Sequence, residues 1–163
     1  MTTKLVLLSH SGFVSPAIRI SSSSGDNIDF LGDVVTHGGG ASASNYADFR
    51  LIGCTFMSNG AKTQYGGAVT LDPLPNAVSN ISGSLFVSNS AGSAGGAVLL
   101  GPQGSDIFYL NSFQENTAGD RGGAVCVFVN SILIQACSFF ANAARHGGAV
   151  WGTRCQWVFG QCQ

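Results

Sequence analysis

The sequence has few charged side chains. They make up 9% of its 163 residues, against about 25% in an ordinary globular domain. Lys and Arg together number seven, they are scattered, and the formal net charge is −1. Because nucleic-acid binding depends on clustered Lys and Arg that neutralise phosphates, this composition argues against a nucleic-acid partner.

Long apolar runs are also missing. No run approaches the roughly 20 residues of a membrane-spanning helix, so we expect no membrane-spanning segment in this chain. The apolar core at the N-terminus covers only Leu5 to Leu8, which is shorter than the roughly 7–15 residues of a signal-peptide core. No signal peptide is therefore recognisable.

None of the five cysteines stands in a CxxC spacing, so zinc and redox motifs are unsupported. The three histidines do not suggest a shared metal site either, because His37 and His146 fall several repeats apart. We expect no metal and no cofactor.

What the sequence does have is a repeat built on two markers. The first marker is Phe-x-x-Asn, whose phenylalanines fall at positions 30, 56, 86, 113 and 139. The second is a Gly-Gly pair, which begins at positions 39, 66, 95, 122 and 147 and is followed by Ala and, in four copies, Val. Both markers share a period of about 27 residues, which is typical of a repeat architecture. The structural repeat residues are Phe56, Asn59, Gly66, Gly67, Phe86, Asn89, Gly95, Gly96, Phe113, Asn116, Gly122, Gly123, Phe139, Asn142, Gly147 and Gly148.

Each repeat contains strand-like runs and no helical periodicity. One run, rich in aromatic and β-branched residues, ends at the phenylalanine, and a second follows the Gly-Gly pair. Loops with Pro and Gly close the repeat at residues 72–80 and 101–105. A β-propeller needs a longer period and leucine-rich repeats need a leucine consensus. The sequence therefore predicts an all-β fold, a parallel β-helix solenoid of about five to six rungs.

We expect a single domain over residues 1–163. Residues 1–29 form an irregular first turn, residues 30–150 the regular repeats, and residues 151–163 the start of a further rung. Since Cys162 occupies the position two places before the next expected phenylalanine, we interpret the chain as a segment of a longer protein.

Stacking of identical residues gives the motif its physical meaning. The phenylalanines should form an internal aromatic stack, and the asparagines a ladder of side-chain amides. The Gly-Gly pair should serve a corner that needs positive φ or leaves no room for a Cβ.

Phe-x-x-Asn alternating with Gly-Gly-Ala-Val resembles the repeat of the chlamydial polymorphic outer membrane proteins. The resemblance covers residues 30–150. It implies a right-handed β-helix displayed at a cell surface or outside the cell, with adhesion as its role. Such a resemblance supports an inference about fold better than one about function.

The main alternative is a β-helix polysaccharide lyase or hydrolase, which needs two or three converging carboxylates. The eight acids mostly scatter over the repeat, apart from Asp48 and Asp106, which fall near one column two rungs apart. Asp33 stands at an asparagine position and is better interpreted as part of that ladder. We therefore expect no enzyme activity.

One charged column does align. Asp120 and Arg145 stand two places before their glycine pairs, and Arg121 and His146 stand one place before. This column is either a polar binding strip or a solvated corner with a weak surface ion pair.

Two further sites come from local patterns. Cys137 and Cys162 occupy the same position in consecutive repeats, which would bring their Cα atoms into the disulfide range; the alternative is two buried thiols. Asn80 begins a glycosylation sequon in the longest loop.

Together these features predict a non-catalytic surface module with a structural or adhesive role. Its partner would be a protein or a cell surface, bound through the loops, or further copies or rungs of the same solenoid. A scaffold subunit of a larger assembly is the remaining alternative. No column repeats threonine, which disfavours an ice-binding surface.

Overall fold

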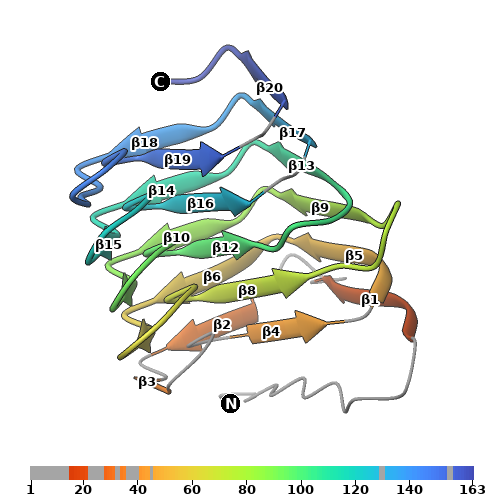
Figure 1. Cartoon of the computed structure of the whole chain (residues 1–163), viewed down its shortest axis with the longest axis horizontal. Helices are drawn as coiled ribbons and strands as arrows, with labels where there is room; N and C mark the ends of the chain where they lie inside the picture. The colour runs from red at the N-terminus through yellow and green to blue at the C-terminus, as the bar shows by residue number, and fades with distance from the viewer. Residues whose placement is uncertain are drawn as a thin grey trace.

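The computed structural model describes residues 15–21, 28–31, 34–35, 41–44, 46–128, 131–153 and 156–163. Every regular element in these residues is a β-strand. Figure 1 shows the strands stacked in layers up to β20. The fold is an all-β parallel solenoid of about four turns, so the predicted solenoid is confirmed at this level.

The strands form four parallel sheets, which we call sheets A to D. Sheet A contains β1 (Ser15–Ser21), β5 (Tyr46–Ile52), β9 (Val78–Ser82), β13 (Ser105–Tyr109), β17 (Ser131–Gln135) and β20 (Gln156–Gly160). Sheet B contains β2 (Ile28–Leu31), β6 (Cys54–Met57), β10 (Leu85–Val87), β14 (Ser112–Gln114) and β18 (Ser138–Phe140). Sheet C contains β3 (Val34–Val35), β7 (Gly60–Ala61), β11 (Ser90–Ala91) and β15 (Thr117–Ala118). Sheet D contains β4 (Ala41–Ser44), β8 (Val69–Asp72), β12 (Val98–Leu100), β16 (Val125–Phe128) and β19 (Val150–Thr153).

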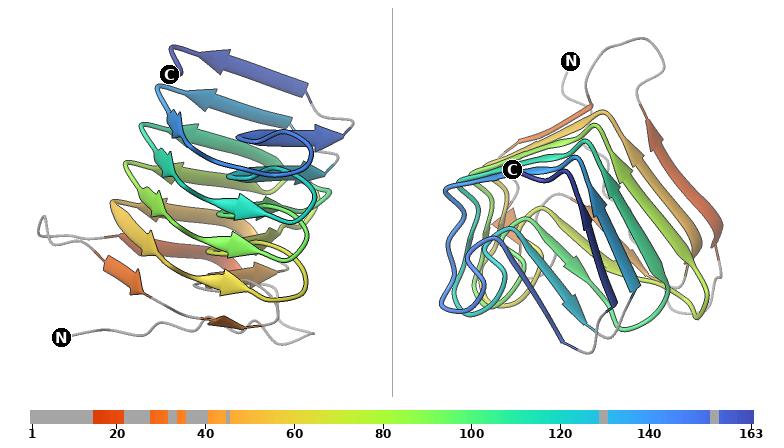
Figure 2. Two further views of the ribbon diagram at one scale, coloured as in Figure 1. Left: turned by 90° about the vertical axis from the view of Figure 1, so that its left-hand side faces the viewer. Right: turned by 90° about the horizontal axis from the view of Figure 1, so that it is seen from above.

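Equivalent residues of successive repeats lie directly above one another. Phe86 pairs in register with Phe56 on one side and Phe113 on the other. Seen from above, the rungs follow the same outline (Figure 2). Since side chains alternate between the two faces of a strand, each inward position becomes a column of the core.

The aromatic column runs through the centre of the solenoid. Neighbouring rings of Phe56, Phe86, Phe113 and Phe139 stack with centroids 5.0, 4.8 and 5.0 Å apart and interplanar angles of 4°, 8° and 5°. The first three rings are completely buried. Burial of large rings in near-parallel contact makes this column a main source of core stability.

The asparagine column forms a continuous hydrogen-bond ladder at the corner between sheets B and C. In each step the backbone N and the side-chain Nδ2 of one asparagine both donate to Oδ1 of the next, at 2.9–3.1 Å, from Asn59 through Asn89 and Asn116 to Asn142. The second Nδ2 hydrogen of Asn89 bonds to the carbonyl of Phe56, and that of Asn116 to the carbonyl of Phe86. The ladder thus satisfies buried polar groups at a corner where the sheets are interrupted.

The two glycines of each pair are needed for different reasons. Gly95 has a φ of +66°, in the left-handed region that favours glycine. Gly96 does not, but a Cβ on it would collide with the carbonyl oxygens of Gly123 and Thr117 in the next rung. Both of the expected causes therefore operate: Gly95 combines positive φ with a lack of room for a Cβ, which would meet the Val98 carbonyl, whereas Gly96 lacks only the room.

The placement expected for Asn80 is wrong. It lies at the centre of β9 in sheet A, between Arg50 and Ile107, and not in a loop. The reason is that Ser79 and Ile81 on either side are buried, so the segment alternates as a strand despite its polar residues. The inserted loop covers residues 73–77, and glycosylation of Asn80 stays a prediction.

Candidate functional site

The outer face of sheet D carries the candidate site. Two outward columns run along it. The first contains Thr70, Leu99, Cys126 and Trp151, which pair in register. The second, two residues further along each strand, contains Asp72, Gly101, Phe128 and Thr153 by the same count from the glycine pair. Unlike the inward columns, neither of them repeats one residue type.

Aromatic side chains cover part of this face. The ring of Phe128 meets Tyr65 edge-on at 6.5 Å and Trp151 edge-on at 5.8 Å between centroids. Beneath them Leu99 and Cys126 are buried although they point away from the main core. Tyr65, Phe128 and Trp151 therefore form a small external apolar layer, which we call the aromatic strip.

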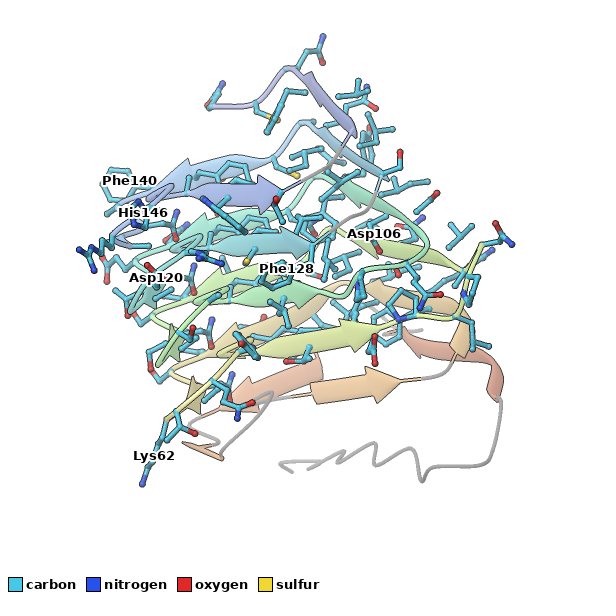
Figure 3. The ribbon with its side chains drawn as sticks, in the orientation of Figure 1. Lys62, Asp106, Asp120, Phe128, Phe140 and His146 are labelled. Atoms are coloured by element: carbon cyan, nitrogen blue, oxygen red, sulfur yellow. The ribbon has the colours of Figure 1, made fainter. Side chains whose placement is uncertain are left out.

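A charged corner adjoins the aromatic strip. Arg121 Nε lies 3.1 Å from Asp120 Oδ2, and His146 Nε2 lies 3.7 Å from Asp120 Oδ1. The guanidinium carbon of Arg121 stands 4.6 Å above the centre of the Trp151 ring. Figure 3 shows Asp120 and His146 at one corner and Phe128 on the adjoining face. Cation and ring attract each other because the face of the indole is electron-rich.

The structure brings together most of the predicted charged column. Arg121 and His146 are opposite one another in adjacent rungs, as their spacing indicates. The partners of the Asp120 carboxylate differ from the expected Arg145, because it contacts its neighbour Arg121 and His146 instead. All three side chains keep roughly half of their surface exposed, so the corner is hydrated and its ion pairs are weak.

Sequence reasoning missed the aromatic strip. The sequence contained a signal for two of its three residues. In every repeat the residue directly after Gly-Gly-Ala-Val points outward, and so does the residue two places further along the strand. Counting outward positions would have found Trp151 and Phe128. Tyr65 lies outside these positions, one place before its glycine pair.

A groove of about 530 Å³ opens beside the strip. Its walls include Tyr65, Thr70, Asp72, Leu99, Pro102 and Phe128, and Gly101 lies among them. Gly101 supplies no side chain between Asp72 in the rung before it and Phe128 in the rung after it, and the Asp72 carboxylate lies over Gly101. This volume lies within the range of small-molecule sites.

The acids considered for catalysis do not converge. Asp48 pairs with Val78, whereas Asp106 pairs with Ser79, so they occupy neighbouring columns. Asp106 points into the core with 2% of its surface exposed. Burial raises the pKa of Asp106 to about 7, and a hydrogen bond with Ser79 opposes that rise.

Cys137 and Cys162 lie in one inward column, as Gln163 N bonds to the Cys137 carbonyl at 3.1 Å. Both are thiols in the structure. Burial chiefly raises the pKa of Cys137, and the nearby Cys162 raises it further. The disulfide stays a prediction for oxidised protein.

Two other findings concern only the described part of the chain. There, no three or more His, Cys, Asp and Glu side chains gather as a metal site. In the same residues no helix is long and apolar enough to cross a membrane. Comparison of the chain with models of protein families, with curated proteins and with solved structures gives no match.

Proposed function

We propose that the chain is a non-catalytic β-solenoid surface module with a structural or adhesive role, which makes contacts with proteins or cell surfaces. One observation carries the proposal. The inward columns repeat Phe, Asn and Gly, whereas the outer face of sheet D changes from rung to rung and presents aromatic and charged side chains together. A regular core that displays a variable face is how solenoids build extended binding surfaces.

The aromatic strip and the charged corner are the proposed contact region. Arg and aromatic residues are enriched at the energetic centres of protein interfaces. Arg121 and Trp151 combine both features at 4.6 Å. This region replaces the loops as the first place to look for a partner, while the loops at residues 73–77 and 101–104 border the same end of sheet D.

The remaining features of the proposal follow the resemblance to polymorphic outer membrane protein repeats. We propose a right-handed coil of five to six rungs in the whole segment, and a location outside the cell or at its surface. Scarcity of charge and a partner-binding face are compatible with that location.

The scaffold alternative has an observation of its own. Phe159 in β20 has 54% of its surface exposed although it pairs with the buried Ile134 of β17, and β18, β19 and β20 are edge strands. Such edges accept further strands. Sedimentation velocity distinguishes the two roles, because end-to-end assembly would give a series of growing species.

The test of the adhesive role is binding of the chain to an array of extracellular-matrix proteins and cell-surface glycans. We expect a partner whose binding weakens at least tenfold in Arg121→Ala and Trp151→Ala. Tyr109→Ala removes an exposed aromatic from the outer face of sheet A and should leave binding unchanged. Equal effects of all three variants, or no partner with end-to-end assembly instead, would contradict the adhesive role. If the chain cleaves a polysaccharide and Asp48→Asn abolishes the cleavage, that result would favour the alternative of a polysaccharide lyase or hydrolase.

A further inference from the structure

We propose that the groove on sheet D is a binding site for a small organic cation, namely an ammonium group carried two or three bonds from an apolar ring. The site would bind a free small molecule. It does not depend on the adhesive role, because the groove is lined by Tyr65 and Phe128 of the aromatic strip but not by Arg121 or Trp151, on which the binding test of that role rests.

The shape of the groove follows from the outward columns. Asp72, Gly101 and Phe128 stand at equivalent positions in three successive rungs. The carboxylate of Asp72 leans over Gly101, since a Cβ added there would lie 2.8 Å from Asp72 Oδ1. The carboxylate of Asp72 thus covers Gly101 at the edge of the groove, whose lining also includes the ring of Phe128 from the next rung.

The walls fix the chemistry of the occupant. Tyr65 and Phe128 present rings at an interplanar angle of 80°, and Leu99 and Pro102 add aliphatic surface. Ring faces attract cations through their quadrupoles, and apolar walls favour an apolar body. A molecule in this groove therefore needs little hydrogen bonding and gains most from buried apolar area.

Charge decides the sign of the ligand. Asp72 is the one ionisable acid or base among the described residues that line the groove, apart from the phenol of Tyr65. Carboxylate and ring faces both favour a cation and both disfavour an anion. The guanidinium of Arg121 does not line the groove, and it is already held over Trp151 and paired with Asp120.

The experiment compares three ligands with the same ring and different charge: 2-phenylethylammonium, 2-phenylethanol and 3-phenylpropanoate. Binding to the full chain is measured by NMR titration with resonances assigned. The amine should bind about tenfold more tightly than the alcohol, a ratio that corresponds to about 1.4 kcal/mol from the carboxylate and ring faces together. The propanoate should bind more weakly than the alcohol. The largest shift changes should fall on Leu99, Gly101 and Phe128.

Variants separate charge from shape. Asp72→Asn keeps the size of an exposed side chain, so the chain should fold, and it should make the amine bind like the alcohol. Glu115→Gln removes another exposed carboxylate, from the turn after β14, and should change nothing. Any of three results overturns the proposal: equal binding of amine and alcohol to the unaltered chain, equal effects of the two variants, or no shift changes at the groove up to about 10 mM amine. None of these results bears on partner binding at Arg121 and Trp151.

Discussion

Asn89 donates two hydrogen bonds to a single oxygen atom of Asn116. Its backbone N and its Nδ2 reach Asn116 Oδ1 at 3.0 and 2.9 Å, and both residues are completely buried. A buried amide in this arrangement accepts the backbone N–H of one rung and holds that rung at a fixed distance from the next. The ladder is therefore a stability element with a measurable size.

Replacing Asn116 with Ala should lower the free energy of unfolding by about 3 kcal/mol. The substitution leaves Asn89 N and the Phe86 carbonyl without their partners in a buried place, and each orphaned group costs about 1–3 kcal/mol. Urea unfolding measures the change. Thr117→Ala, on the exposed neighbour, is the control, and a loss for Asn116→Ala within 1 kcal/mol of that control would show that the ladder contributes little.

The second glycine of a pair should tolerate no side chain. Gly96→Ala places a methyl group against two backbone carbonyls. It should either prevent folding or lower the free energy of unfolding by more than about 4 kcal/mol, which few single substitutions do. Gly83→Ala is the matched control, because Gly83 has a φ of +58° but open space around its Cα, and should cost only about 1–2 kcal/mol. Circular dichroism and thermal unfolding compare the two; a folded Gly96→Ala as stable as Gly83→Ala would contradict this account.

The period of the sequence made the inward columns predictable. Two markers at one spacing place every Phe above a Phe and every Asn above an Asn, whatever the exact path of the chain. The same period indicates that a Gly-Gly pair has a corner role. Which glycine needs both positive φ and space and which needs space alone could not be predicted from the spacing.

Other features lacked a local signal. Ser58, Ser88 and Glu115, each one place before a ladder asparagine, adopt positive φ values of 57°, 53° and 54°. Residues of these types rarely indicate such a conformation, and here the asparagine bonds hold the turn. The aromatic strip is different, because counting outward positions indicates Trp151 and Phe128, and only the contact with Tyr65, which lies outside those positions, depends on how the rungs stack.

Asp106 should make the stability of the protein depend on pH. Burial raises its pKa to about 7 from an ordinary value of 3.8, so between these values the folded chain binds a proton that the unfolded chain releases. Stability should be fully present below about pH 4, fall as the pH rises, and level off above pH 7, with a total loss on the order of 4 kcal/mol.

The comparison with Asp106→Asn isolates this effect from other titrating groups. The amide at position 106 is neutral at every pH in this variant. Its free energy of unfolding, relative to that of the unaltered chain, should therefore rise between pH 4 and 7 and stay constant above pH 7. Urea unfolding at pH 4.5, 6 and 8 measures the difference. A difference that does not vary with pH would mean that Asp106 titrates normally.

Cys137 and Cys162 should differ in reactivity once reduced. Burial raises the pKa of the Cys137 thiol, whereas Cys162 is only half-buried, and the thiolate is the reactive form. Iodoacetamide at pH 8 should therefore alkylate Cys162 at least tenfold faster in the folded chain and both at similar rates in urea. A peptide map without reduction tests the disulfide, which two separate unlinked peptides would exclude.

The central claim is the parallel stacking of rungs that are 26–30 residues apart, and NMR tests it most directly. In uniformly labelled protein, we expect contacts between amide and α protons that follow the parallel register of Leu85 with Ser112 and of Phe86 with Phe113, together with contacts between the two stacked phenylalanine rings. Close contacts between pairs of α protons on strands adjacent in sequence would instead show antiparallel hairpins and contradict the solenoid.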